Sequence, residues 1–251
     1  MKILVVSQYF WPENFRINDL VSELLSRGHE VTVLTGVPNY PDGKVFPEYK
    51  NNSNQYAAYK GAEIVRVPLI PRKSGAIWLL LNYISYFVAA CTWGVFKLRG
   101  RKFDVIFTCQ LSPVTVGLPA ALLRRLKGIP MVFWVLDLWP ESLQAVGVVK
   151  SNFLLNLVGK LTAFIYRHCD LILVQSKAFI PQILKYAPGV KCIEYFPSWA
   201  EDVFSSNEEM LAAEVMQQQG SFNVMFAGNI GDAQDFPAIL AAAKKLKQYT
   251  H

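Results

Sequence analysis

The sequence predicts an α/β fold built on a doubly wound parallel sheet, and three observations lead to this prediction. Short apolar runs alternate with helical stretches along most of the 251 residues. Most of the apolar runs are continuous and lack polar alternation, as expected for strands buried on both faces. Hydrophobic residues make up 52% of the chain and charged residues 18%, which excludes a disordered chain and indicates a well-filled core.

The strands and helices follow one another in a regular order. We expect strands at Ile3–Ser7, Glu30–Thr35, Glu63–Pro68, Asp104–Thr108, Met131–Leu136, Leu171–Gln175 and Lys191–Tyr195. We expect helices near Ile17–Arg27, Ile77–Leu98, Val114–Leu126, Phe153–His168 and Ala178–Tyr186. Repeated strand–helix units form right-handed crossovers, and ligands of such sheets bind outside the carboxyl ends of the strands.

Two irregular stretches interrupt this order. Gly36–Lys60, rich in proline, asparagine and tyrosine, is predicted to form a loop over the site. A polar stretch near the C-terminus reads as an interdomain linker, followed by a new strand at Asn223–Ala227 and a helix from Phe236 to about Lys247. One strand and one helix cannot bury a core. We therefore expect an N-terminal domain over 1–197, a linker over 198–220 and only the first strand–helix unit of a second domain over 221–251.

The segment Ala76–Phe96 carries no charged residue and is long enough to span a bilayer. The strands predicted before and after it belong to one sheet, which a single span would divide between two compartments. Basic clusters flank both ends, so the positive-inside rule selects no orientation. We therefore predict a buried or membrane-touching helix.

The net charge of +6 raises the question of an anionic partner. The chain has no basic stripe with interleaved aromatic residues, so nucleic acid is not expected. The cations gather beside apolar segments, as suits an anionic membrane surface, although a solvated basic face is the alternative. The four cysteines are far apart and form no C-x-x-C pair, which favours a reducing, cytoplasmic setting without a metal site. The basic clusters are Arg72 and Lys73, then Lys97, Arg99, Arg101 and Lys102, then Arg124, Arg125 and Lys127.

The stretch from Ser7 to Arg16 leads from the first strand into the first helix. It has no G-x-G-x-x-G, so a nicotinamide or flavin cofactor is not supported. Backbone amides at the start of the helix favour an anionic group. The alternative is structural: Pro12 starts the helix and the aromatic residues cover the sheet edge.

The stretch from Trp134 to Ser142 contains the candidate catalytic residue. Asp137 follows directly on an apolar strand, between Trp134 and Trp139, and would serve as a general base or as an anchor for an acceptor hydroxyl. Helix capping or a salt bridge is the alternative role. Glu141 lies four residues further on, and a hydrolytic carboxylate pair would require a defined separation between the two groups.

Five motifs carry a resemblance to a known family: MKILVVSQYFWPE, LLSRGHEVTVLTG, VPNYPDG, FWVLDLWPES and FAGNIGDAQDFPAIL. With them the chain resembles family 4 glycosyltransferases of the GT-B architecture. The combination of VPNYPDG and DLWPES is most similar to the bacterial subgroup that assembles O-antigen, capsule and colanic acid. Within that subgroup the likeness extends to N-acetyl-L-fucosamine transferases.

The resemblance implies two Rossmann-like domains that face each other across a cleft. The N-terminal domain would bind the acceptor, a lipid-linked saccharide, and the C-terminal domain the nucleotide-sugar donor, with no metal and no other cofactor. Asp137 stands where many members have a histidine, which makes it the candidate catalytic residue. Gly228 and Asn229 match the loop that approaches the donor diphosphate. The candidate acceptor-binding residues are Trp11, Pro12, Glu13, Asn14, Asn39, Tyr40, Trp139 and Glu141.

The expected activity is transfer of a sugar, with retention, from a UDP-linked amino sugar to a lipid-linked saccharide in surface polysaccharide biosynthesis. The enzyme would act in the cytoplasm, peripherally on the inner face of the membrane. Because the family's further donor residues do not lie within this chain, we expect negligible transfer by the chain alone. Two alternatives remain: a non-catalytic, membrane-associated acceptor-binding or scaffold protein, and a GT-B sugar-nucleotide epimerase, which the basic surface and apolar segment disfavour.

Overall fold

The structure, a computed structural model, describes residues 1–73, 75–145, 147, 149, 151–200, 224–228, 230, 234–247 and 249. The chain divides into two compact units, Met1–Ser198 and Trp199–His251, and each is considered by itself. Most of the predicted linker, 198–220, lies outside the described residues.

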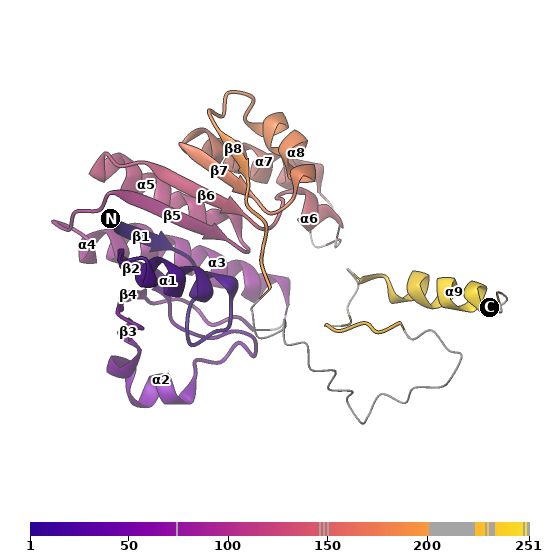
Figure 1. The fold of residues 1–251 in the computed structure, drawn as a ribbon, viewed down its shortest axis with the longest axis horizontal. Coiled ribbons are helices and arrows are strands. Elements are labelled where there is room, and N and C mark those ends of the chain that lie inside the picture. The colour runs from indigo at the N-terminus through magenta and orange to yellow at the C-terminus, as the bar shows by residue number, and fades with distance from the viewer. Residues whose placement is uncertain are drawn as a thin grey trace. The chain divides into compact units, whose positions relative to one another are not determined.

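The first unit is built on one eight-stranded sheet (Figure 1). The strand order is β3-β4-β2-β1-β5-β6-β7-β8, and every neighbouring pair is parallel except β3 with β4. The predicted doubly wound, Rossmann-like α/β sheet is therefore confirmed. The strands are β1 (Lys2–Val6), β2 (Glu30–Gly36), β3 (Ala58–Tyr59), β4 (Ala62–Val67), β5 (Val105–Gln110), β6 (Met131–Val135), β7 (Leu171–Val174) and β8 (Ile193–Tyr195).

Helices connect the parallel strands and cover the sheet. Because crossovers are right-handed, α1, which leads from β1 to β2, lies on one face of the sheet, and α3, α5, α7 and α8, which lead in the opposite direction, lie on the other. Contacts between α5 and α7 and between α7 and α8 join this second layer. The helices are α1 (Arg16–Ser26), α2 (Pro47–Asn51), α3 (Ala76–Ala89), α4 (Val95–Lys97), α5 (Gly117–Lys127), α6 (Glu141–Ala145), α7 (Asn152–Arg167), α8 (Ile180–Tyr186) and, in the second unit, α9 (Phe236–Leu246).

The main hydrophobic core lies between the sheet and the layer of α3, α5 and α7. Alternate strand residues such as Leu4, Ile106 and Phe133 point into it and are fully buried. Their neighbours on the strands, such as Val5 and Val33, are buried on the α1 face together with Ile17. Burial on both faces explains the continuous apolar runs in the sequence.

The seven strands predicted for the first domain agree with the structure to within two residues at each end. The strand predicted at Asn223–Ala227 was wrong for its described part, because residues 224–227 form no strand. A lone strand without a hydrogen-bonded neighbour is not stable, which is the physical reason. The helix predicted after it is confirmed as α9. The predicted loop Gly36–Lys60 contains α2, a 3₁₀ turn at Ser53–Tyr56 and the short edge strand β3.

The long apolar helix is not a regular α-helix. α3 passes through a π-helical turn at Ala90–Gly94 into α4, so that one helical stretch runs over Ala76–Lys97. By length and composition this stretch is apolar enough to cross a membrane, with a mean hydropathy of 1.5. Its two flanking strands, β4 and β5, belong to one sheet, as the sequence predicted.

Candidate functional site

The candidate site lies at the carboxyl edge of the sheet, where the loops after β1, β2, β4, β5 and β6 meet. The predicted residues form two groups there. The Glu13 cluster comprises Glu13, Asn39 and Tyr40 in the loops after β1 and β2, and the Asp137 cluster comprises Asp137 and Trp139 after β6 with Gln110 at the end of β5.

Glu13 is almost completely buried, with 2% of its surface exposed. Its Oε1 accepts hydrogen bonds from the backbone N–H groups of Asn39 (2.8 Å) and Tyr40 (2.7 Å), and its Oε2 accepts one from Phe10 N–H (3.3 Å). Burial raises the pKa of Glu13 to about 6, although these donors favour the charged form. The carboxylate therefore holds the loop after β1 to the loop after β2.

Arg66 on β4 ties the same loops to the sheet, and it was not among the residues selected from the sequence. It is 9% exposed, its Nη1 donates to Gly36 O at 2.9 Å, and its Nη2 donates to Trp11 O. Burial lowers its pKa to about 10, which leaves the guanidinium charged at neutral pH. An arginine between the apolar residues Val65 and Val67 of a strand is the sequence signal that could have drawn attention to it.

The remaining predicted residues of the first loop lie at its surface. Trp11 is half-buried, and its ring lies 5.0 Å from Tyr56 and 5.5 Å from Tyr59. Pro12 is half-buried and Asn14 is exposed. These side chains line the outer side of the loop that Glu13 holds in place.

A cavity of about 560 Å³ opens between the loop after β2 and the start of α3. Tyr40 lines it, and the Arg72 guanidinium lies 5.6 Å from the Tyr40 ring. The loops after β2 and β4 pack tightly here. Arg72 N–H donates to Asn39 Oδ1 at 2.8 Å, and a Cβ at Gly43 would lie 1.3 Å from Arg72 O. Gly43 also has φ +66°, a conformation that favours glycine. The cavity combines a cation with an aromatic wall.

Asp137 is half-exposed, in contrast with Glu13. Its Oδ2 accepts a hydrogen bond from Trp139 Nε1 at 2.9 Å, and its backbone oxygen accepts one from Gln110 Nε2 at 2.8 Å. Its Oδ1 accepts no hydrogen bond from any residue that the structure describes. The side chain is thus oriented by a tryptophan while one carboxylate oxygen remains open to a ligand.

Tyr83 on α3 lies between the two clusters. Its ring is 6.2 Å from Trp139 and its hydroxyl is 3.4 Å from Ser112 Oγ. Burial raises the pKa of Tyr83, and the charges of Arg72 and Asp137 act on it in opposite directions. The adjacent residue, the fully buried Asn82, accepts a hydrogen bond from Gln8 Nε2 (2.7 Å) and donates one to Ile70 O (2.7 Å). A polar residue inside an apolar helix is the sequence signal that could have identified this network.

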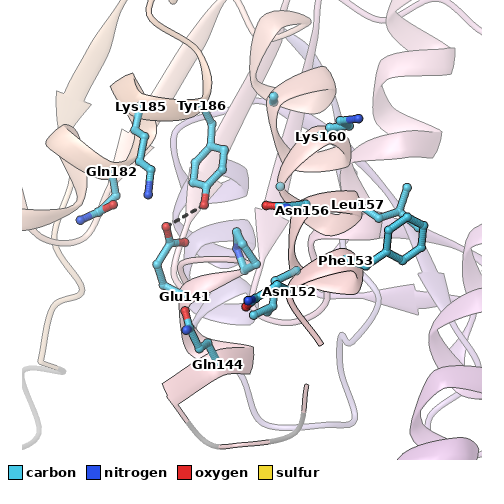
Figure 2. Close-up of a pocket in the computed structure, with 14 residues that line it drawn as sticks. Glu141, Gln144, Asn152, Phe153, Asn156, Leu157, Lys160, Gln182, Lys185 and Tyr186 are labelled. Atoms are coloured by element: carbon cyan, nitrogen blue, oxygen red, sulfur yellow. Dashed lines mark hydrogen bonds between the residues drawn. The ribbon is translucent and has the colours of Figure 1, made fainter. Parts of the chain in front are cut away.

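Glu141 faces a different cavity, of about 890 Å³, between α6, α7 and α8 (Figure 2). Figure 2 shows its carboxylate meeting the Tyr186 hydroxyl, which donates a hydrogen bond to Oε1 at 2.9 Å. Burial and this carboxylate raise the pKa of Tyr186 to about 12. Gly159 of α7 makes room for the Tyr186 ring, which a Cβ would approach to 2.9 Å. Glu141 therefore contributes to the wall of this cavity, and Asp137 and Glu141 have different partners.

The predicted donor residues lie in the second unit. Gly228 is exposed, and Asn229 lies outside the described residues. Among the residues that the structure describes, no group of His, Cys, Asp and Glu side chains could hold a metal ion. At the carboxyl edge the described side chains include the Asp137 carboxylate, the Tyr40 ring and the Arg72 cation.

Comparisons with known proteins place the chain in a family. The profile of a glycosyl transferase 4-like domain matches residues 14–188, which is more than half of the chain. The putative colanic acid biosynthesis glycosyl transferase WcaI of Escherichia coli K12 is 24% identical over 98% of this chain and 63% of its own length. The probable glycosyltransferase WbjE of Pseudomonas aeruginosa is 26% identical over 59% of this chain and 38% of its own length.

This chain thus spans less than two thirds of each of these relatives. Among solved structures, Anabaena Alr3699/HepE in complex with UDP and glucose aligns with 80% of this chain and 45% of that one, at 12% identity and a TM-score of 0.47.

Proposed function

Since the chain belongs to the glycosyl transferase 4-like domain family, we propose that it forms the acceptor side of a retaining glycosyltransferase. The donor is a nucleotide sugar, specifically a UDP-linked amino sugar, and the acceptor is a lipid-linked saccharide. The reaction belongs to surface polysaccharide biosynthesis, a setting supported by the relative named for colanic acid biosynthesis. The resemblance to N-acetyl-L-fucosamine transferases makes N-acetyl-L-fucosamine one candidate for this amino sugar.

The observation that carries this proposal is the open oxygen of Asp137 at the carboxyl end of β6. Trp139 fixes one carboxylate oxygen, and the other is available to accept a hydrogen bond from an acceptor hydroxyl. Orienting that hydroxyl toward the anomeric carbon of the donor supplies rate by positioning. The bond that forms joins the acceptor oxygen to the anomeric carbon, and the bond that breaks joins this carbon to the donor diphosphate.

The other residues have supporting roles in this proposal. Tyr40 forms a wall for the acceptor saccharide, the buried Trp139 orients the Asp137 carboxylate, and Arg72 offsets the charge of the acceptor phosphate. Glu13 and Asn39 hold the loop that carries Tyr40. Trp11, Pro12, Asn14 and Glu141 extend the acceptor surface, and Gly228 and Asn229 approach the donor diphosphate.

The test separates acceptor from donor binding. The chain is titrated by calorimetry with a short polyprenyl diphosphate that carries one N-acetylglucosamine, and separately with UDP and UDP-N-acetylglucosamine. We expect binding of the sugar-lipid, and we expect Asp137→Asn to weaken it while binding of the sugar-free lipid stays unchanged. Tight binding of UDP without binding of the sugar-lipid would reverse the assignment of this half of the protein.

The proposed place of action is the cytoplasmic face of the cell membrane, where a lipid-linked acceptor is located. The long apolar helix and the basic clusters beside it support this setting.

A further inference from the structure

The outer face of α3 is apolar and exposed. Ile77, Leu80, Ile84 and Val88 expose 74, 57, 44 and 48% of their surfaces. Spacings of three and four residues place these side chains on one stripe of the helix. A surface helix of a water-soluble protein normally turns such a stripe toward its core, so here the pattern is reversed. We call this stripe, together with Leu81 and the terminal Trp78, Trp93 and Phe96, the α3 outer face.

The α3 outer face cannot turn inward, because the opposite face is fixed. Asn82 and Tyr86 are fully buried on the sheet side. Ser85 Oγ accepts a hydrogen bond from Ile70 N–H at 2.8 Å, and Asn82 Nδ2 donates one to Ile70 O at 2.7 Å. These bonds hold α3 to the segment that follows β4. The exposure of the apolar stripe therefore follows from the packing of the domain.

Cations and tryptophans stand at both ends of the helical stretch. Lys73 Nζ lies 4.1 Å from the Trp78 ring, and at the other end Arg99 Cζ lies 4.2 Å from the Phe96 ring, beside Trp93. The sequence contains no acidic residue between Glu63 and Asp104. Tryptophan favours the level of lipid headgroups, and lysine and arginine favour anionic lipids. This charge pattern selects an anionic bilayer over a protein partner of mixed charge.

The topology determines how the helix meets the bilayer. β4 ends at the carboxyl edge of the sheet, and β5 starts at the amino edge of the same sheet. α3 therefore runs back across the sheet with one side on the core, an arrangement that suits a helix in the plane of a membrane surface and not one that crosses it.

We propose that the α3 outer face docks this domain on an anionic lipid bilayer, with the helix in the plane of the headgroups. This deepens the proposed function and rests on it for its purpose. The start of α3 lines the cavity of Tyr40, Arg72 and Lys73, so docking brings this cavity to the headgroup level. A saccharide on a lipid diphosphate then reaches the carboxyl edge without leaving the bilayer.

The test is partition of the chain onto vesicles that contain neither donor nor acceptor sugar. Vesicles of phosphatidylcholine with 30% phosphatidylglycerol are compared with phosphatidylcholine alone, by co-sedimentation. Ile84→Glu is paired with Leu184→Glu on α8, because the two side chains have similar exposure, 44 and 41%. We expect Ile84→Glu to weaken partition by about tenfold or more, and Leu184→Glu to leave it unchanged. Equal effects of the two substitutions would overturn the proposal.

The basic residues at the two ends of the helical stretch and the depth of the helix in the bilayer are tested separately. Lys73→Gln and Arg99→Gln should each weaken binding to the anionic vesicles about fivefold, with no effect on neutral vesicles. Lipids brominated near the headgroup should quench the tryptophan fluorescence of the protein more than lipids brominated near the ends of their acyl chains. This difference should shrink in the double variant Trp78→Phe, Trp93→Phe. Quenching that is strongest from the deep bromines would contradict an in-plane helix.

A second copy of the chain is the competing occupant of this face. Sedimentation equilibrium without lipid distinguishes it: a dimer that Ile84→Glu dissociates, together with no vesicle binding, overturns the proposal. Failure of the proposed function is a different result. A chain that binds bare anionic vesicles but does not bind the sugar-lipid keeps the docking face and rejects the acceptor site.

Discussion

The two carboxylates that follow strands at the carboxyl edge, Glu13 and Asp137, have opposite surroundings. Glu13 is buried, and its two oxygens accept three backbone hydrogen bonds. Asp137 is half-exposed, and among the residues that the structure describes only Trp139 donates a hydrogen bond to its carboxylate. Asp137 was selected because it follows directly on an apolar strand, and Glu13 because the motif that contains it, MKILVVSQYFWPE, resembles the family. The difference shows that position at a strand end does not separate a carboxylate that builds the site from one that is offered to a ligand.

The largest expected effect is on stability. Glu13→Ala leaves three backbone N–H groups without their acceptor, and we expect it to lower the free energy of unfolding by about 3 kcal/mol. Asp137→Ala should lower it by about 1 kcal/mol, because that side chain accepts one part-buried hydrogen bond, from Trp139. Urea unfolding measures both, with the exposed Glu48→Ala as a control. Equal losses of stability from Glu13→Ala and Asp137→Ala would show that the two carboxylates contribute alike to the fold.

The next effect is a pH dependence. Burial raises the pKa of Glu13 from 4.5 to about 6, so the folded state retains this proton after the unfolded state has lost it. Stability therefore falls as the pH rises from about 4.5 to 6, by about 2 kcal/mol from this group. The measurement is the difference between the wild type and Glu13→Gln, which cannot titrate. A difference that is constant across this window would show that folding does not raise the pKa of Glu13.

A smaller effect is expected on ligand affinity. Asp137→Asn keeps an oxygen for Trp139 and replaces the open oxygen by an amide group, which cannot accept a hydrogen bond. We expect affinity for the sugar-lipid to fall about tenfold, with no change in melting temperature. Calorimetry with the sugar-lipid and a thermal scan measure the two quantities. Undiminished affinity would assign Asp137 a structural role beside Trp139.

The smallest effect concerns the residue between the two clusters. Tyr83→Phe removes a hydroxyl that makes one long contact with Ser112, and we expect a loss of stability of about 0.5 kcal/mol. Ser112→Ala should have a similar effect, and the double variant should lose no more than either single variant. Additive losses would show that the two hydroxyls act independently.

The sheet could be predicted from the sequence because its strands are buried on both faces and read as apolar runs. The edge strand β3 could not be predicted in this way, since a strand of two paired residues is too short to show a periodicity. For the site, the order of strands and helices identified the edge, which located Asp137 and Trp139. It could not identify Arg66, whose partners Gly36 and Trp11 lie 30 and 55 residues away in the chain. Likewise, nothing in DLWPES indicates that Glu141 pairs with Tyr186, 45 residues further on.

The π-helical turn at Ala90–Gly94 keeps the buried side of the helical stretch Ala76–Lys97 facing the sheet along its length. The buried residues Asn82, Tyr86, Ala90, Gly94 and Leu98 recur every four residues. In a regular α-helix this spacing drifts by about 40° per step, so that Leu98 would rotate about 160° away from the direction of Asn82. The wider turn takes up the extra residue and cancels much of this drift. The wider turn thereby keeps Gly94 against Leu34, where an added Cβ would lie 3.0 Å from the Leu34 side chain. One helical stretch can therefore pack against the sheet along its whole length, even though most of its surface is exposed.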